Sequence, residues 1–363
     1  MTARLDSSAC PTPLWLPGGH LQTIYSAHYT RHRRIAFVRE RRETSDGDFI
    51  DFDWAGPGLY PERLHSGELV RADVQLRHTA ARRWFQEEDK QSLPQDPDTR
   101  ALLLIHGLEG SSKSHYAQAI AQYLRARGWV VVIAHFRGCS GFPNRMARAY
   151  FSGDSEDIAF MLASVRARLP QAQWHTAGVS MGGNALLKYL GEQQQAADWI
   201  KGCVAVSAPL DLLACGEQLS NSFWGRYIYS PYFLRSMRAK ILAKTHRYPG
   251  LIDFIQLNQI RTIREFDDLY TAPMHGYRNA HDYWQSCSAK PLLKNIAVPT
   301  LILNALNDPF IPAQTLPAVR DCSKQILLHQ PPTGGHVGFT TGAFPGSFQW
   351  LAQRVAHFFR TNS

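Results

Sequence analysis

The sequence predicts an α/β protein with a mostly parallel central sheet and helices on both faces. Beyond residue 100, short and continuously apolar segments alternate with longer segments whose apolar residues recur at helical spacing. Continuously apolar strands are typical of parallel sheets that are covered on both faces. In addition, a Gly-x-Ser-x-Gly turn at residues 178–182 joins one such strand to the helix that follows it, and this motif requires a sharp reversal of the chain.

The first 99 residues have a different pattern. The prolines and glycines of residues 13–23 predict an irregular lead-in without a regular element. Segments 34–43 and 49–54 predict two strands, and the Asp-Gly between them is typical of a hairpin. We expect this antiparallel pair at an edge of the sheet. Residues 56–99 are polar and contain several prolines, which predicts a surface excursion without chemistry.

The alternating part of the chain predicts the strands and helices of the main sheet. The helix at 115–127 is expected to end at Gly128, and the helix at 154–169 begins with acidic residues and is stopped by Pro170. The expected strands are 101–105, 129–134, 173–177, 203–206, 300–304 and 325–328, and the expected helices are 115–127, 154–169, 184–192 and 348–359.

The net charge of +9 raises the question of nucleic-acid or membrane-surface binding. Six arginines lie between Arg31 and Arg42, but they alternate partly with apolar residues, which predicts a strand with one solvated face. No recognition-helix, zinc-finger or stacking-aromatic motif accompanies them. We therefore expect no nucleic-acid partner.

The remaining composition predicts a cytoplasmic globular protein. No apolar run reaches the roughly 18 residues of a membrane-spanning helix, and the first residues lack the apolar core of a signal peptide. The six cysteines show neither Cys-x-x-Cys nor zinc-type spacing. We expect reduced structural thiols, no metal site and no cofactor.

Candidate catalytic residues follow several of the expected strands. Ser180 follows the strand at 173–177, Asp308 follows the strand at 300–304, and His336 lies in a glycine-rich loop after the last strand. The carboxyl ends of parallel strands meet at one edge of a sheet, so we expect these side chains to lie close together. The chain order Ser, Asp, His is the order that α/β-hydrolases use.

Several motifs together resemble the α/β-hydrolase superfamily and, more narrowly, the AB hydrolase-4 family of YheT-like esterases. They span nearly the whole chain apart from residues 56–99. The motifs are Gly19-His20-Leu21-Gln22-Thr23, His106-Gly107-Leu108-Glu109-Gly110-Ser111, Arg137-Gly138-Cys139-Ser140-Gly141, Gly178-Val179-Ser180-Met181-Gly182-Gly183-Asn184, Asn307-Asp308-Pro309-Phe310 and Gly335-His336-Val337-Gly338-Phe339.

The resemblance implies a catalytic triad and an oxyanion hole. Ser180 needs a base, and His336 is the candidate, with Asp308 orienting the imidazole. The backbone N–H groups of Leu108 and Met181 are expected to stabilise the oxyanion.

Other residues offer alternatives to these assignments. Asp211 could replace Asp308, because some hydrolases place their acid after that strand. We expect His106 to shape the oxyanion loop, Cys139 to be a buried structural thiol, and Glu109 to have a structural or surface role.

The resemblance also implies a helical cap over the site. We expect one domain, residues 1–363, with a core of about 30–210 and 298–363 and a cap insertion at 211–297. Aromatic residues of the cap are expected to pack it on the core or to line an acyl pocket, and the candidates for substrate contact are Phe223, Trp224 and Tyr227. Basic residues follow in the cap, namely Arg235, Arg238, Lys240, Lys244 and Arg247.

These features predict a serine hydrolase that cleaves short- to medium-chain carboxylic esters through an acyl-enzyme. The expected partner is a small ester or lipid, and the basic cap allows an anionic ester or peripheral contact with a phospholipid surface. A thioesterase or acyltransferase would share the acyl-enzyme. A non-catalytic small-molecule receptor on the same scaffold is the alternative from another class.

Overall fold

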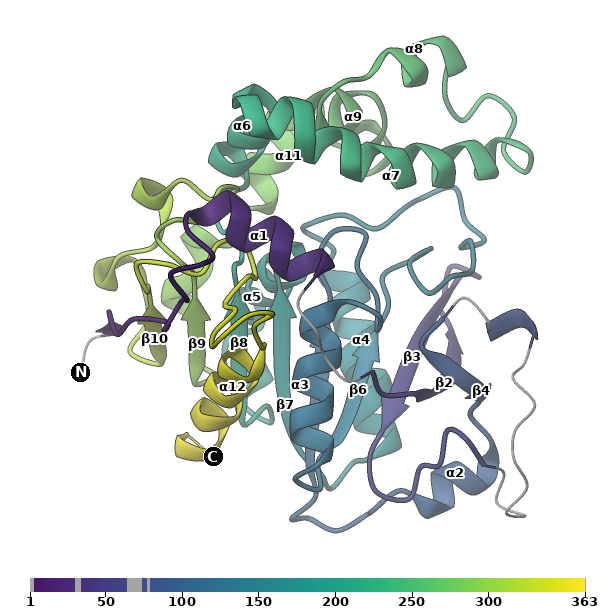
Figure 1. Ribbon diagram of the computed structural model, residues 1–363. Coiled ribbons are helices and arrows are strands. Elements are labelled where there is room, and N and C mark those ends of the chain that lie inside the picture. The colour runs from purple at the N-terminus through teal and green to yellow at the C-terminus, as the bar shows by residue number, and fades with distance from the viewer. Residues whose placement is uncertain (1–2, 30–33, 64–73, 77–78, 363) are drawn as a thin grey trace.

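The computed structural model describes residues 3–29, 34–63, 74–76 and 79–362. Its strands are β1 (Arg4–Asp6), β2 (Phe37–Glu43), β3 (Phe49–Ala55), β4 (Ala81–Trp84), β5 (Arg100–Ile105), β6 (Val130–Ala134), β7 (Gln173–Val179), β8 (Gly202–Val206), β9 (Thr300–Leu303) and β10 (Ile326–His329). They form one sheet in the spatial order β1-β10-β9-β8-β7-β5-β6-β3-β2-β4 (Figure 1).

The sheet is parallel except around β3, which runs antiparallel to both β2 and β6. The predicted hairpin and the mostly parallel sheet are therefore confirmed. The hairpin is not at the edge, however, because β4 pairs with the outer side of β2. Residues 56–99 are thus not only a surface excursion, and Arg83 of β4 is buried against Asp89 of α2 (Glu87–Ser92). Residues 64–73 and 77–78 of this segment lie outside the described residues.

The irregular lead-in predicted for residues 13–23 is wrong from residue 19 on, where a helix begins, whereas residues 13–18 are irregular as expected and are preceded by a strand that was not predicted. β1 pairs in parallel with β10, and α1 (Gly19–His28) follows Gly18, whose φ is 72°. The helix begins after the last proline of the segment, Pro17, so the prolines end before the helix instead of interrupting it. The sheet therefore includes residues that precede the expected core boundary near residue 30.

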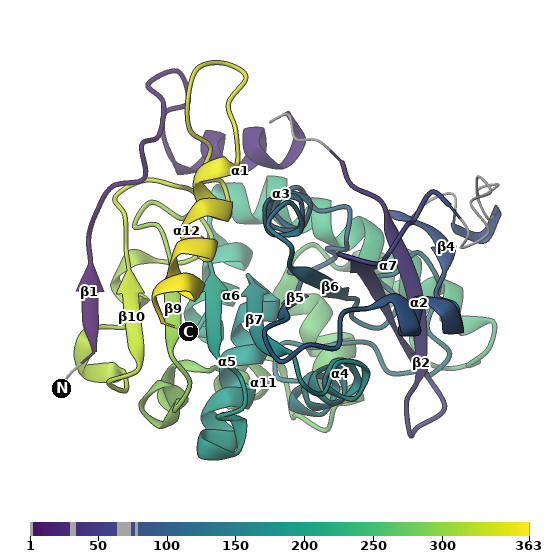
Figure 2. The same ribbon diagram turned by 90° about the horizontal axis from the view of Figure 1, so that it is seen from below.

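Helices cover both faces of the sheet (Figure 2). One face carries α3 (His115–Arg125) and α12 (Gln349–Thr361), and the other carries α4 (Ser155–Arg168) and α5 (Met181–Gln193). Each face has its own buried apolar cluster. Within the described residues no helix has the length and apolar character needed to cross a bilayer.

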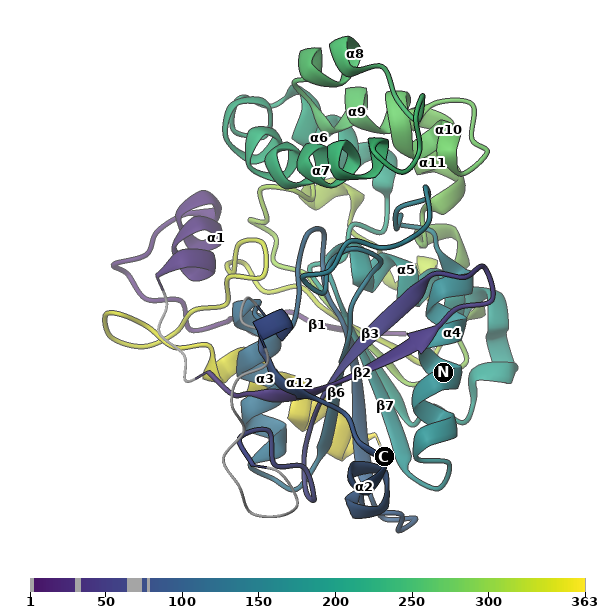
Figure 3. The same cartoon turned by 90° about the vertical axis from the view of Figure 1, so that its right-hand side faces the viewer.

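Residues 212–287 are built of helices that lie over the carboxyl edge of the sheet (Figure 3), whereas residues 290–295 pack against α5. Most apolar side chains of this region form clusters separate from the two sheet clusters, whereas Ala289 and Leu293 pack in one of the sheet clusters. The helical elements are α6 (Leu212–Asn221), η3 (Gly225–Tyr229), α7 (Ser230–Thr245), α8 (Phe254–Gln259), α9 (Ile263–Phe266), η4 (Asp267–Thr271), α10 (Ala272–Met274), α11 (Ala280–Cys287) and η5 (Lys290–Asn295).

The solvated face that we expected for the arginine run is wrong at Arg39. This side chain is fully buried, and its guanidinium donates to both carboxylate oxygens of Asp53 at 2.7 Å. Burial alone would raise the pKa of the Asp53 carboxyl, but the charge of Arg39 holds that pKa well below its usual value. The acid lies on the neighbouring strand, so the pattern of β2 alone does not reveal the pair. Arg31 and Arg33 lie outside the described residues.

Candidate active site

Ser180 occupies the sharp turn between β7 and α5. Its φ of 51° and ψ of −125° lie far from the usual regions for an L-residue. A Cβ atom on Gly178 would lie 2.6 Å from the carbonyl oxygen of Gly182, and one on Gly182 would lie 2.4 Å from that of His106. The glycines are therefore required by the close approach of strand, helix and the neighbouring loop.

His336 and Asp308 lie in the loops that follow β10 and β9, and the structure brings both to Ser180. His336 Nε2 lies 2.9 Å from Ser180 Oγ, and His336 Nδ1 lies 2.9 Å from Asp308 Oδ2. Because a carboxylate can only accept, Nδ1 carries the hydrogen and Nε2 accepts from the serine hydroxyl. The Asp308 side chain is buried and also accepts from the amide of Phe310 at 2.8 Å.

The loop that carries His336 is held by side chains from other parts of the chain. Each of its four consecutive amides from 334 to 337 donates to a side-chain oxygen. Val337 has a φ of 54°, which is unfavourable for a β-branched residue, so these bonds hold a strained loop in place. The acceptors, in the order of the donating amides, are Gln22 Oε1 at 3.0 Å, Asn307 Oδ1 at 2.9 Å, Thr23 Oγ1 at 2.9 Å and Ser207 Oγ at 3.0 Å.

Sequence reasoning missed Gln22 and Thr23, which lie on α1 and reach the His336 loop. The signal was their place in the Gly19–Thr23 motif, which indicates the family resemblance but by itself assigns these side chains no role. Their contacts join residues more than 300 positions apart in the sequence. No local pattern could reveal such a contact.

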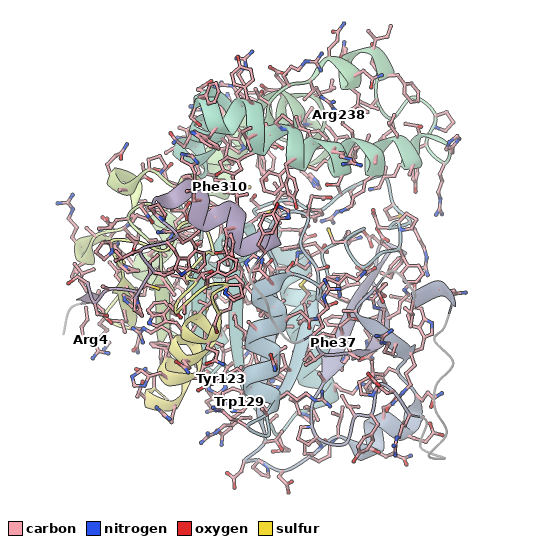
Figure 4. The ribbon with its side chains drawn as sticks, in the orientation of Figure 1. Arg4, Phe37, Tyr123, Trp129, Arg238 and Phe310 are labelled. Carbon is pink, nitrogen blue, oxygen red and sulfur yellow. The ribbon has the colours of Figure 1, made fainter. Side chains whose placement is uncertain are left out.

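An aromatic residue links His336 to the cap. Phe310 stands beside the imidazole of His336, with ring centroids 4.2 Å apart, and packs edge-on against Tyr229 of η3 at 4.5 Å. Figure 4 labels Phe310 where the core meets the helices above it. The Tyr229 hydroxyl in turn lies 2.9 Å from Nδ1 of His20 on α1.

The two residues whose amides we expect to form an oxyanion hole are Leu108 and Met181. Both residues line the same cavity as Ser180 and His336. Met181 starts α5 directly after Ser180, where a helix N-terminus leaves N–H groups without intrahelical partners. The preceding loop residue, Gly107, is so close that a Cβ on it would lie 3.0 Å from the Cβ of Ser180.

His106 fixes the loop that carries Leu108. Its Nδ1 donates to the carbonyl oxygen of Gly107 at 2.8 Å, and its Nε2 accepts from the amide of Phe136 at 3.1 Å. Burial, aided by the charge of His135, lowers the pKa of His106 to about 3. The neutral imidazole is therefore a structural part of the loop, as expected.

Glu109 joins this loop to the cap. Its Oε1 accepts from Lys240 of α7 at 2.8 Å and from the Tyr150 hydroxyl at 2.6 Å. Lys240 Nζ also lies 3.1 Å from Cys139 Sγ. Burial raises the pKa of the Cys139 thiol to about 11, so the thiol is neutral at physiological pH.

A cavity of about 140 Å³ lies between the carboxyl edge of the sheet and the cap helices. Ser180 and His336 lie in its wall, and most of the cap side chains that face it are apolar. The apolar ones include Leu219, Phe233, Met237, Ile241, Phe266 and Trp284, and the polar ones include Lys240, Lys244 and Asp267. Glu109, from the loop after β5, also lines the cavity.

The three cap aromatics that we expected at the substrate do not line this cavity. Phe223, Trp224 and Tyr227 are 69%, 38% and 60% exposed, and they point to solvent around η3. Phe233 and Trp284 line the cavity in their place. The aromatic composition of the segment does not say which side of each helix faces the core, so it could not distinguish the two groups.

The structure separates Asp211, the alternative acid, from the imidazole. Its carboxylate caps α6 by accepting from the amide of Ala214 at 3.1 Å, whereas Asp308 contacts His336 directly. This cap is the ordinary use of an aspartate at a helix N-terminus.

The sheet order, the turn at Ser180 and the helices over the carboxyl edge define an α/β-hydrolase fold. A sequence model of the family described as "alpha/beta hydrolase fold" matches residues 100–343. The chain belongs to this family and, within it, to the AB hydrolase-4 family.

Similar proteins carry esterase and lipase names. "Putative esterase YheT" of Escherichia coli is 35% identical over 94% of this chain and 90% of its own length. "Monoacylglycerol lipase" of Saccharomyces cerevisiae is 26% identical over 95% of this chain and 79% of its own. "Phospholipase ABHD3" of Mus musculus is 31% identical over 92% of this chain and 73% of its own length. A solved esterase of Pyrococcus furiosus matches 99% of this chain and 98% of its own with a TM-score of 0.53 at 13% identity, which supports the fold alone.

Proposed function

We propose that this protein is a serine hydrolase that cleaves carboxylic esters through an acyl-enzyme. The observation that carries the proposal is the chain of contacts from Ser180 Oγ through His336 to Asp308, with both contacts at 2.9 Å. The names of the related esterase and lipases support an ester or lipid as the substrate class.

In the proposed reaction, Ser180 Oγ attacks the acyl carbon while its proton moves to His336 Nε2. Asp308 stabilises the imidazolium, and the N–H groups of Leu108 and Met181 receive the oxyanion. Collapse of this intermediate releases the alcohol, which takes the proton from His336. Water, activated by the same imidazole, then releases the carboxylic acid and restores Ser180.

The apolar wall of the cavity supports an acyl group of short to medium length. Phe233, Phe266 and Trp284 offer the acyl chain an apolar surface on the cap side, and Ser180 and His336 lie in the same cavity. An ester panel of graded chain length with a common p-nitrophenyl leaving group measures this preference. We expect kcat/KM to rise up to medium chain lengths and then to fall.

The test of the nucleophile is Ser180→Ala. We expect a fluorophosphonate probe to label the wild type on Ser180, and the variant to lose both labelling and about 10⁴-fold or more of p-nitrophenyl ester turnover. Ser207→Ala is the matched control, since Ser207 bonds the His336 loop without contacting His336 Nε2; it should still be labelled. Undiminished labelling of Ser180→Ala would refute the proposal.

The same assay also tests other leaving groups and other acyl acceptors. Faster turnover of acyl thioesters than of matched oxygen esters would indicate a thioesterase, and transfer to an added alcohol in preference to water would indicate an acyltransferase. Tight binding of an ester without any turnover or labelling would indicate a receptor.

A further inference from the structure

Part of the cap and α1 together expose an aromatic face that the catalytic site does not use. We call it the aromatic face. Its members contact one another: the rings of Phe223 and Tyr227 are 5.2 Å apart, and those of His28 and Tyr232 are 5.8 Å apart. The exposed members are Phe223, Trp224, Tyr227, Ile228 and Tyr232 around η3 and the start of α7, and Leu21 and Tyr29 at α1.

The two segments that form the aromatic face contact each other through His20. Its imidazole stacks on Trp224 with centroids 4.4 Å apart and lies 2.9 Å from the Tyr229 hydroxyl. Figure 1 and Figure 3 both place α1 below one end of the cap helices, on the side of the molecule where the strands end. The exposed side chains therefore form one continuous surface rather than scattered apolar residues.

Neither chain segment that forms the aromatic face contains an acidic residue. The sequence contains no aspartate or glutamate between Asp6 and Glu40, or between Glu217 and Asp253. The second stretch contains six lysines and arginines, and Arg226 and Arg235, which lie among the exposed aromatics, are themselves exposed. The two segments thus contribute only positive formal charge to the aromatic face, which is complementary to an anionic surface.

The aromatic face is also close to the catalytic residues. Tyr229, next to the exposed Ile228, packs on Phe310, and Phe310 packs on His336. Phe233, one residue after the exposed Tyr232, lines the cavity. A surface held against this face would therefore lie beside the rim of the cavity.

We propose that the aromatic face docks on the surface of an anionic lipid assembly. Tryptophan and tyrosine favour the boundary between lipid head groups and acyl chains, because they have an apolar body and a polar tip. Arginines beside them add attraction to negatively charged head groups, and this attraction weakens with salt. Docking is a property separate from ester turnover.

The test is co-sedimentation of the full chain with phosphatidylcholine vesicles that contain or lack phosphatidylglycerol. We expect binding to the anionic vesicles at low salt, weaker binding at high salt, and little binding to phosphatidylcholine alone. Ser180→Ala should bind like the wild type. Failure of the proposed ester hydrolysis would therefore leave this result unchanged.

Two double variants test the aromatic face itself. Arg226→Glu with Arg235→Glu, and separately Phe223→Ser with Tyr227→Ser, should each weaken vesicle binding by about tenfold or more. Their turnover of a soluble short-chain ester should remain at the wild-type level, because none of the four residues lines the cavity.

A matched control makes the same charge change elsewhere. Arg127→Glu with Arg360→Glu reverses two exposed arginines at the C-terminal ends of α3 and α12, away from the cap. This variant should bind vesicles within about twofold of the wild type.

Three results would overturn the proposal. The first is no binding to anionic vesicles at low salt. The second is equal loss of binding in the control and in the variants of the aromatic face. The third is a wild type that is dimeric without lipid and becomes monomeric in the Phe223→Ser, Tyr227→Ser variant, which would assign the face to a second copy of the chain.

Discussion

Asp308 and Asp211 both follow strands of the sheet, yet they have different partners. Asp308 contacts His336 Nδ1 at 2.9 Å, and Asp211 caps α6. An orienting carboxylate fixes the tautomer in which Nε2 can accept a proton, so its loss affects catalysis more than folding. The sequence offered both residues, and only their positions in space distinguish them.

We expect Asp308→Asn to lower kcat for p-nitrophenyl esters by about 10³- to 10⁴-fold, because an asparagine can favour the wrong imidazole tautomer. Asp211→Asn is the matched control, and its kcat should stay within about threefold of the wild-type value, since asparagine also caps helices well. Steady-state kinetics of both variants measure this. A large loss in Asp211→Asn with a mild effect in Asp308→Asn would show that the acid is misassigned.

At the level of elements, α1 is as much a part of the site as the strands are. Gln22 and Thr23 hold two amides of the His336 loop, and Gln22 Oε1 also accepts from Asn307 at 2.9 Å, in the loop that carries Asp308. A helix near the N-terminus thereby joins the two loops that carry His336 and Asp308. This arrangement gives the Gly19–Thr23 motif a physical role.

Thr23→Val removes the oxygen that accepts from the amide of His336 and should misplace the imidazole. We expect kcat to fall about tenfold or more with KM changed less than twofold, because the unpaired amide costs roughly 1–3 kcal/mol. Thr23→Ser keeps the hydroxyl and should restore most of the activity.

Ser26→Ala is the control for this prediction. It removes another buried hydrogen bond of α1, to Thr340, without touching residues 334–337. It should lower stability without lowering kcat. Equal effects of Thr23→Val and Ser26→Ala on kcat would mean that α1 acts only through overall stability.

At the scale of the whole molecule, the cap buries a carboxyl group against the cavity. Asp267 accepts from Trp284 Nε1 at 2.9 Å, and burial raises its pKa to about 7. Between pH 4 and 7 the folded state holds a proton there that the unfolded state releases, so the free energy of unfolding falls as pH rises through this window. Above pH 7 the full cost of a buried charge is present.

Asp267→Asn removes this charge and keeps an acceptor for Trp284. We expect the variant to gain stability over the wild type as pH rises from 4 to 7, by up to about 4 kcal/mol, and the difference to be constant above pH 8. Urea unfolding at pH 5 and pH 8 measures it. Asp198→Asn, at an exposed position, is the control and should show no such change. A pH-independent difference for Asp267→Asn would contradict this role of burial.

Along the chain, continuously apolar segments alternate with segments of helical periodicity. By itself this pattern determined the sheet, its helices and the positions of the loops that carry Ser180, Asp308 and His336. These are local signals: a buried parallel strand must be apolar throughout, and a sharp strand-to-helix turn must be glycine-rich. The family resemblance added the expected roles and the helical insertion.

Only the tertiary structure decided which distant groups meet. It placed α1 and β1 within the fold, buried Arg39 against Asp53, turned Phe223 to solvent and Phe233 to the cavity, and brought the hydroxyl of Thr23 to the His336 loop. The physical reason is that a side chain's partner and the direction it faces depend on packing between segments far apart in the sequence. Local composition carries no record of that packing.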